Sequence, residues 1–237
     1  MLEVINLNAG YGKLQVLFNV SLKVPEKSIT VVVGPNGSGK STLLKTIFGL
    51  TRIYSGKILF CGEDVTNKPP HKIAQTGLTY MPQIGNVFEN LTVRENLLMA
   101  TYGLDENKAR DRIEEALSLF PVLKTYMDRR VSTLSGGERQ MLGITIVMIR
   151  NPKLIMMDEP TAALSPKIAY QVLRAIEKLR DEYGKTVLLV EQNAKAALEI
   201  GDNAVLMVSG QVVYSGDATT LLKRRDLGSM YLGLTSS

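Results

Sequence analysis

Residues 34–41 read Gly34-Pro35-Asn36-Gly37-Ser38-Gly39-Lys40-Ser41, and this stretch decides the fold of the chain. It matches the pattern G-x-x-x-x-G-K-[ST] at every fixed position. The apolar run Ser28–Val33 precedes it and a helical pattern, Thr42–Phe48, follows it. Gly37 and Gly39 permit the positive φ and the close approach that let backbone N–H groups converge on a phosphate. Placed between a strand and a helix, the stretch predicts a phosphate-binding loop (P-loop).

The composition of this loop predicts binding of ATP with Mg²⁺. Lys40 places a point charge between the β- and γ-phosphates, and the Ser41 hydroxyl can coordinate Mg²⁺. The positive end of the following helix adds its dipole beneath the same phosphates. The alternative is a glycine-rich turn without a ligand, and the strand–loop–helix context argues against it. The expected nucleotide contacts are Gly34, Pro35, Asn36, Gly37, Ser38, Gly39, Lys40, Ser41 and Thr42.

Two adjacent acids follow the second apolar strand pattern, Leu154–Met157. A buried strand can carry Asp158 to a Mg²⁺ beside Ser41. Glu159, one position further, can act as the general base for the attacking water. The plainer interpretation is a strand that ends in polar residues, which is weak downstream of a P-loop. A GTPase is excluded, because Asn67-Lys68-Pro69-Pro70 replaces the Asn-Lys-x-Asp motif that reads guanine.

The rest of the chain alternates strands with helices, which implies a mostly parallel sheet and an α/β fold. The first two runs, Leu2–Leu7 and Val16–Val24, are expected to form an antiparallel pair. Further strands are expected at Lys57–Phe60, Leu78–Pro82, Thr186–Glu191 and in a hairpin of Ala204–Val208 with Gln211–Tyr214. Helices are expected at Pro69–Gln75, Leu91–Thr101, Glu106–Phe120, Ser135–Ile149, Pro166–Tyr183, Ala194–Ile200 and in the tail after Asp217.

The block from about residue 90 to 134 has helical patterns and no strand pattern. It interrupts the strand–helix alternation, so we interpret it as an inserted helical subdomain. Residues 1–89 and 135–237 would then form the core together with the antiparallel strands, all within one domain.

The string Leu134-Ser135-Gly136-Gly137-Glu138-Arg139-Gln140 is the most specific in the chain. Ser135 and Glu138 form the S-x-x-E capping box of a helix start. Two consecutive glycines have no capping reason and favour a binding role. With the P-loop, Asp158-Glu159 and Gln83, the string resembles the nucleotide-binding subunits of ABC transporters, over essentially the whole chain.

This resemblance implies a P-loop NTPase with a RecA-like core that hydrolyses ATP. It implies that Ser135, Gly136, Gly137 and Glu138 of one subunit touch the γ-phosphate held by the P-loop of another. ATP would then be buried between two head-to-tail subunits, as a homodimer or as a heterodimer with a related ATPase. Helix starts present unpaired N–H groups and a positive dipole, which suits this use.

Two further positions follow from the same resemblance. Tyr11 falls where an aromatic residue stacks on adenine, with a packed strand-edge tyrosine as the alternative. Gln83, after Met81-Pro82, falls where a glutamine reaches Mg²⁺ or water and connects to the helical subdomain. The segment Gln83–Glu95 would also face the membrane subunits.

Two positions depart from the common pattern of the family. The switch histidine is replaced in Glu191-Gln192-Asn193, and the loop Ala163-Leu164-Ser165-Pro166 lacks the usual aspartate. Both departures resemble one subgroup, the LivF-type ATPases of branched-chain amino acid importers. Gln192 can donate a hydrogen bond to a γ-phosphate oxygen but cannot become cationic. We expect Gln192 to position the phosphate and Glu159 alone to act as the base.

The composition of the chain limits where the protein would be found in the cell and which classes of partner it would bind. The net charge of +5 comes from interleaved basic and acidic residues, which does not suggest nucleic-acid binding. A single cysteine, Cys61, excludes an intramolecular disulfide, suits the reducing cytoplasm and is expected to be a small buried residue. No stretch approaches the roughly 20 apolar residues of a membrane span. The resemblance therefore implies a peripheral protein on the cytoplasmic face of the membrane, with integral permease subunits and an external substrate-binding protein as partners.

Other functions remain open at this point. A soluble ABC-type ATPase that acts on nucleic acid or ribosomes is the main alternative, although no long coiled coil or second cassette is present. A nucleotide-binding module without turnover is a third, which Lys40, Asp158 and Glu159 argue against. Phosphate release would exclude the module without turnover, and co-purification with membrane proteins would exclude the soluble ATPase.

Overall fold

The computed structural model describes residues 1–224 and 228. Its central sheet has six strands in the order β10-β9-β3-β8-β7-β6. Strands β3, β6, β7, β8 and β9 are parallel, and β10 is antiparallel to β9, so the predicted mostly parallel sheet is confirmed. The strand bounds are β3 Ile29–Val33, β6 Leu78–Met81, β7 Leu154–Asp158, β8 Thr186–Val190, β9 Asn203–Val208 and β10 Gln211–Asp217.

A second, antiparallel sheet is built mainly from the N-terminal part of the chain and has the order β2-β1-β4-β5. The predicted antiparallel pairing of the first two strands is confirmed, and both strands are longer than predicted. The bounds are β1 Leu2–Tyr11, β2 Leu14–Val24, β4 Arg52–Phe60 and β5 Glu63–Asp64. The sulfur-bearing Cys61, expected to be buried, is exposed because it lies in the tight turn between β4 and β5, where its φ is +51°.

The central sheet is covered on both faces, because neighbouring residues of each strand point into different cores. Val31 and Val33 join a core with α5, α6 and α7, while Val32 joins the core beneath α1 and the antiparallel sheet. All five residues of β3 are buried, as the continuous apolar run predicts. The helix bounds are α1 Lys40–Ile47, α5 Gly136–Ile149, α6 Pro166–Asp181 and α7 Ala194–Ile200. Because β3, β7 and β8 are parallel, their carboxyl ends share one edge, where the P-loop, Asp158 and Glu159 lie.

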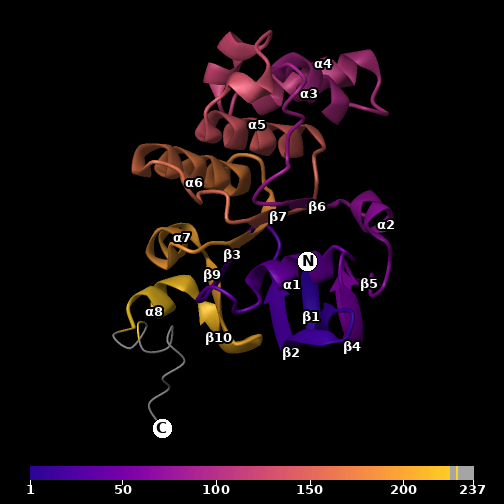
Figure 1. Cartoon of the computed structure of the whole chain (residues 1–237), viewed down its shortest axis with the longest axis vertical. Helices are drawn as coiled ribbons and strands as arrows, with labels where there is room; N and C mark the ends of the chain where they lie inside the picture. The colour runs from indigo at the N-terminus through magenta and orange to yellow at the C-terminus, as the bar shows by residue number, and fades with distance from the viewer. Residues whose placement is uncertain (225–227, 229–237) are drawn as a thin grey trace.

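Between β6 and α5 the chain forms helices and loops and no named strand, and Figure 1 shows α3 and α4 at one end of the molecule, beyond α5. A capping box of Thr92 and Glu95 starts α3, and the Asp105 side chain caps α4. Helix α4 ends at Leu117 rather than at Phe120, because Phe120, with φ −139° and ψ 77°, has left the helical conformation that Pro121 disfavours in the residue before it. The bounds are α3 Val93–Ala100, α4 Glu106–Leu117, η1 Pro121–Tyr126 and η2 Val131–Thr133.

Two short helices complete the described chain, α2 Pro70–Gln75 and α8 Ala218–Leu222. The predicted helical tail after Asp217 is confirmed for α8, and the rest of that prediction falls largely outside the described residues. Within the described part of the chain, no helix combines the length and the apolar character that crossing a bilayer requires.

Candidate active site

The P-loop leaves the end of β3 and enters α1 through three glycines with positive φ. These angles are +151° at Gly34, +77° at Gly37 and +96° at Gly39. A Cβ at Gly34 would lie 2.1 Å from the backbone oxygen of Met207 in β9, so a side chain cannot be accommodated there. The β9–β10 turn also holds the loop, since the Gly210 N–H donates to the Ser38 carbonyl at 3.0 Å. The loop is therefore a fixed structure rather than a flexible connection.

Lys40 lies inside this loop and is only 4% exposed. Its Nζ donates to the carbonyl oxygens of Gly34 at 2.8 Å and Pro35 at 3.0 Å. Burial lowers the pKa of Lys40, and the carboxylates of Glu159 and Asp158 oppose that shift. The side chain is thus a positive charge aimed into the curl of the loop, where an anion would meet it.

A cavity of about 230 Å³ opens over the loop and the start of α1. Its walls are Val16, Glu159 and the run from Asn36 to Thr42. No side chain caps the N-terminus of α1, so the N–H groups of the first turn have no partner within the helix. Convergent N–H groups, a buried cation and a positive helix end make this cavity suited to the phosphates of a nucleotide.

Asp158, the last residue of β7, is held by hydroxyl groups on both of its oxygens. The Ser41 Oγ donates to Oδ1 at 2.8 Å, and the Tyr80 hydroxyl donates to Oδ2 at 3.2 Å. Burial, followed by the charge of Asp158, raises the pKa of Tyr80. Sequence reasoning missed Tyr80. The sequence feature that could have revealed Tyr80 is its position in β6. The parallel pairing of β6 with β7 puts Tyr80 opposite Met156, two residues before Asp158.

The side chains of Ser41 and Asp158 fit a Mg²⁺ site that the nucleotide completes. Mg²⁺ prefers one or two protein carboxylates together with phosphate oxygens and water. The hydroxyl–carboxylate contact supplies such oxygens at the mouth of the P-loop. No group of three or more His, Cys, Asp or Glu side chains in the described chain could hold a metal by itself. The fit thus depends on a bound phosphate.

Glu159 borders the P-loop cavity and has the uncommon φ of +49°. Its N–H donates to the Val190 carbonyl of β8 at 2.9 Å, which fixes its backbone beside Asp158. Gln192 is exposed and borders a different cavity of about 600 Å³, between α6, α7 and the loop from Thr161 to Leu164. The structure therefore brings Glu159, but not Gln192, to the cavity above Lys40.

Sequence reasoning also missed the carboxylate of Glu191, which is 2% exposed. It accepts a hydrogen bond from the Thr161 N–H at 2.9 Å. Burial raises its pKa to about 7, and hydrogen bonds from Thr161 and Gln192 oppose the shift. Glu191 was passed over because it ends a strand pattern and matches no motif of its own.

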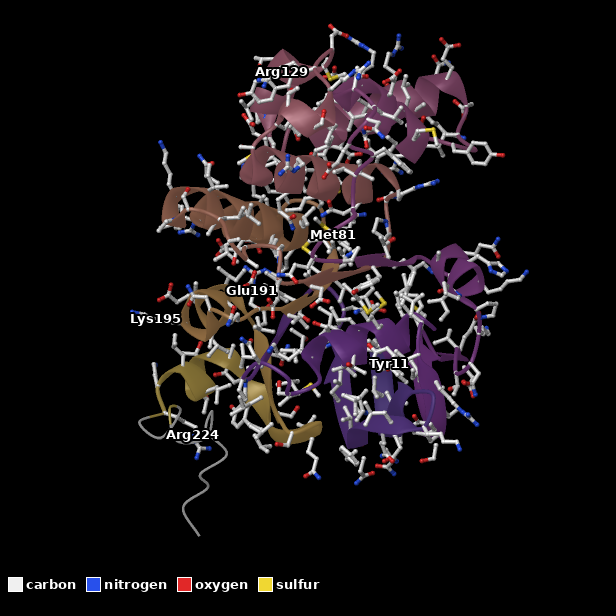
Figure 2. All side chains as sticks on the ribbon, in the orientation of Figure 1. Tyr11, Met81, Arg129, Glu191, Lys195 and Arg224 are labelled. Atoms are coloured by element: carbon white, nitrogen blue, oxygen red, sulfur yellow. The ribbon has the colours of Figure 1, made fainter. Side chains whose placement is uncertain are left out.

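Tyr11 and Gln83 lie outside the P-loop cavity. Tyr11 ends β1, is 45% exposed, and appears in Figure 2 on the antiparallel sheet. Gln83 is exposed in the loop after β6. Neither borders the cavity over Lys40.

The Ser135–Glu138 segment forms the start of α5, away from the P-loop cavity. The predicted capping box is present: the Glu138 N–H donates to Ser135 Oγ at 3.3 Å, and the Ser135 N–H donates to Glu138 Oε2 at 2.7 Å. A Cβ at Gly137 would lie 2.6 Å from Ile168 Cγ2, so close packing against Ile168 explains why this position is glycine. A Cβ at Gly136 would meet no atom within 4 Å, so the chain itself gives no reason for that glycine.

Comparisons with known proteins agree with this geometry. The sequence pattern of the family described as "ABC transporter" matches residues 17–162. The chain is 50% identical to the "Probable branched-chain amino acid transport ATP-binding protein LivF" of Archaeoglobus fulgidus, covering 99% of each chain. It is 39% identical to the "High-affinity branched-chain amino acid transport ATP-binding protein BraG" of Pseudomonas aeruginosa, covering 98% of this chain and 100% of that protein.

A solved structure of an ATP-binding cassette of an ABC transporter in its ADP conformation has a TM-score of 0.84 to this chain. The two are 29% identical, and 98% of each chain is covered. The family resemblance and the fold class inferred from the motifs are therefore confirmed. The chain belongs to the ABC transporter family and is one of its ATP-binding, ATP-hydrolysing cassettes.

Proposed function

We propose that this chain is the ATPase subunit of an importer of branched-chain amino acids. The two named relatives described above, at 50% and 39% identity, support this substrate class. The observation that carries the ATPase part of the proposal is the cavity bordered by the P-loop and Glu159, where Ser41 also contacts Asp158. ATP bound there would be hydrolysed, and the change of subunit contacts on hydrolysis would be coupled to transport.

In this proposal the P-loop holds the phosphates of ATP. Backbone N–H groups of the loop and of the α1 start surround the β-phosphate, and Lys40 approaches the β- and γ-phosphates. To do so, Lys40 exchanges its two carbonyl partners for phosphate oxygens. The exposed ring of Tyr11 stacks on adenine at the end of β1.

Ser41 and Asp158 would hold Mg²⁺, and Gln83 would reach it from the loop after β6. Mg²⁺ when bound would neutralise the charge on the phosphates. The Tyr80 hydroxyl positions Asp158 for this role through its hydrogen bond to Oδ2. An outer partner that holds a ligating carboxylate in place sets its geometry and its affinity.

Glu159 would accept the proton of the attacking water, because it borders the phosphate cavity directly after Asp158. Gln192 would donate its amide N–H to a γ-phosphate oxygen once the second subunit closes the site. Since an amide does not titrate near neutral pH, the base function stays with Glu159 alone.

A second subunit would complete the site with the start of its α5. Ser135, Gly136, Gly137 and Glu138 lie there, and Gly136 has open space where a side chain would stand. An anion can approach the positive helix end at that point. The second subunit is a copy of this chain or a related ATPase of the LivG type.

The helical segment from about residue 90 to 134 would act as a subdomain that turns against the core of residues 1–89 and 135–237. Large apolar side chains are exposed in and before it, among them Ile84 at 82%, Phe88 at 58% and Tyr102 at 84%. We define Ile84, Phe88, Leu98, Met99 and Tyr102 as the apolar patch. Large apolar side chains exposed within one stretch of the chain make that stretch a candidate contact surface for other proteins.

The apolar patch would contact integral permease subunits, which places the chain peripherally on the cytoplasmic face of the membrane. An external substrate-binding protein would deliver the amino acid, and this chain would contact neither that amino acid nor nucleic acid.

Uptake of radiolabelled leucine into vesicles tests the proposal. The vesicles would contain the chain assembled with its permeases and the related ATPase. We expect ATP-dependent uptake with the natural chain and loss of it with Glu159→Gln. Uptake that does not depend on ATP, or another preferred solute, would contradict the proposed function.

A further inference from the structure

Glu191 is a buried carboxylate at a junction between two loops. It follows β8 directly, and its N–H donates to the Val32 carbonyl of β3 at 3.2 Å, so its backbone belongs to the rigid sheet. Its side chain is buried and borders the cavity that residues of α6 and α7 also line. A carboxylate that is 2% exposed is costly to bury, so its retention calls for hydrogen bonds that use it.

The structure gives this carboxylate a backbone donor from one loop, and the chain itself joins it to the second loop. Oε1 accepts from the Thr161 N–H, at 2.9 Å, in the loop that follows Glu159. Gln192 follows Glu191 directly in the loop after β8, and its backbone N–H opposes the rise of the Glu191 pKa. One residue thereby ties the segment of the proposed base to the segment of the proposed phosphate-positioning glutamine.

The loop after Asp158 needs such a restraint, because its backbone is strained. Glu159 has φ +49° and Ala163 has φ +59°, in the left-handed region that favours glycine. Such a conformation is strained and persists only where the surroundings determine it. The restraints from β8 are the Glu159 N–H bond to the Val190 carbonyl and the Thr161 N–H bond to Glu191.

The outer side of the loop is only partly packed. A cavity of about 600 Å³ lies there, and its walls include Thr161, Ala162, Ala163 and Leu164. Leu164 packs against the core, and the bond from the Thr161 N–H to Glu191 restrains the part of the loop nearer to Glu159.

We propose that Glu191 is a positioning residue, which orients Glu159 and the loop from Thr161 to Ser165 for hydrolysis and links them to the loop of Gln192. The proposal rests on the proposed role of Glu159 as the base. Glu191 itself need not touch ATP, because it acts through the backbone that carries Glu159.

Three substitutions at Glu191 separate two properties of its side chain: how far the acceptor oxygen extends from the backbone, and whether it is charged. Glu191→Gln keeps a carbonyl oxygen at the same reach for the Thr161 N–H, Glu191→Asp withdraws the carboxylate by one methylene, and Glu191→Ala removes it. Misplacing a reacting group by about 1 Å can cost on the order of 100-fold in rate. We expect kcat for ATP hydrolysis to fall about 10- to 100-fold in the alanine and aspartate variants, with KM for ATP nearly unchanged.

Glu191→Gln should keep kcat within about twofold of the natural chain, since the acceptor remains. Glu199→Ala is the matched control, because Glu199 borders the same cavity but is exposed. It should leave kcat unchanged. If the alanine variant does not fold, the comparison of aspartate with glutamine decides.

Hydrogen exchange followed by mass spectrometry gives a readout that does not depend on hydrolysis. Peptides covering residues 158–165 should exchange about tenfold faster or more in Glu191→Asp than in Glu191→Gln. Equal exchange, or a kcat in the aspartate variant equal to that of the natural chain, would overturn the proposal. A glutamine variant as slow as the aspartate variant would do the same. If the natural chain failed to hydrolyse ATP, the proposed function would fall while the exchange result would still test Glu191.

Discussion

At the scale of single residues, the site depends on two carboxylates that are held by other side chains or by backbone. Asp158 accepts from Ser41 and Tyr80, and Glu191 accepts from Thr161. Each contact joins residues far apart in the sequence, and each fixes a carboxyl group at the edge where β3, β7 and β8 end. Preorganised groups of this kind need little rearrangement when a substrate binds.

The first prediction concerns Tyr80→Phe, which removes one hydroxyl and leaves the ring that packs against Phe48 at 5.7 Å between centroids. Asp158 Oδ2 would lose its donor. We expect the Mg²⁺ concentration for half-maximal ATP hydrolysis to rise about tenfold, as for other outer partners of metal ligands. Binding of ATP without Mg²⁺ should not change. Identical Mg²⁺ titrations of the two proteins would rule out a positioning role for Tyr80.

The second prediction follows from the raised pKa of Glu191, about 7 instead of 4.5. The unfolded chain releases this proton near its ordinary pKa, while the folded chain keeps it to about neutral pH. Stability is therefore lost as the pH rises between these two values, by about 3 kcal/mol in total. The glutamine in Glu191→Gln stays neutral. The free energy of unfolding of this variant, relative to that of the natural chain, should therefore increase from about pH 5 to about pH 8.

Urea unfolding of both proteins at the two pH values measures this difference. The comparison uses the change with pH, so a constant offset from the substitution cancels. A difference in stability that does not vary with pH would show that Glu191 ionises normally in the folded chain.

Residue types that form a local motif could be predicted from the sequence, and residues that act through long-range contacts could not. The P-loop and Asp158-Glu159 were found because spacing along the chain carries their chemistry. Tyr80 was missed because its contact with Asp158 is set by the pairing of β6 with β7. Glu191 was missed for the same reason, since Thr161 lies thirty residues away in the chain.

At the scale of elements, the helix starts combine stability with exposed N–H groups. Both α3 and α5 begin with a capping box, formed by Thr92 with Glu95 and by Ser135 with Glu138. The two boxes are the same in chemistry, and only the second carries glycines after its first residue. This pair allows capping and nucleotide contact to be separated by experiment.

The third prediction uses that pair. Ser135→Ala and Thr92→Ala should each lower the free energy of unfolding by about 1 kcal/mol, because each loses one cap. Only Ser135→Ala should also slow ATP hydrolysis, since the proposal places the α5 start on the γ-phosphate of the neighbouring subunit. Denaturation curves and phosphate release measure the two effects. An equal loss of hydrolysis in both variants would make the α5 start a structural cap alone.

Element types could be predicted where an apolar pattern is long and is bounded by turn residues, as at Ile29–Val33 and Leu154–Asp158. The residues at which helices and strands end were less predictable. The apolar face of α4 continues to Phe120, but the helix ends at Leu117 because Pro121 constrains the residue before it. The packing of Gly137 against Ile168 joins α5 to α6 and had no local signal.

At the scale of the whole molecule, the phosphate cavity and the apolar patch are formed by different parts of the chain. Figure 1 shows the helices α3 and α4 at the opposite end of the molecule from the antiparallel sheet. Coupling between ATP and a membrane partner would therefore pass through the loop after β6, which joins Tyr80 to α3.

The fourth prediction tests the apolar patch with Phe88→Asp. A buried charge in an interface weakens binding strongly, so we expect loss of co-purification with the permease subunits. ATP hydrolysis by the isolated chain should persist. Val213→Asp is the matched control, because Val213 is also an exposed apolar residue, 40% accessible, but lies on β10. If both variants still co-purified with the permeases, the patch would not be the docking surface.

The central claim is that ATP is held between the P-loop of one subunit and the α5 start of another. The most direct test is the molar mass of Glu159→Gln, alone and mixed with the related ATPase, measured by light scattering during size-exclusion chromatography with and without Mg–ATP. Slowed hydrolysis should trap the closed state, so the account predicts the mass of two chains with Mg–ATP, in one of the two samples at least, and of single chains without it. Particles with the mass of one chain and ATP stably bound in both samples would contradict it.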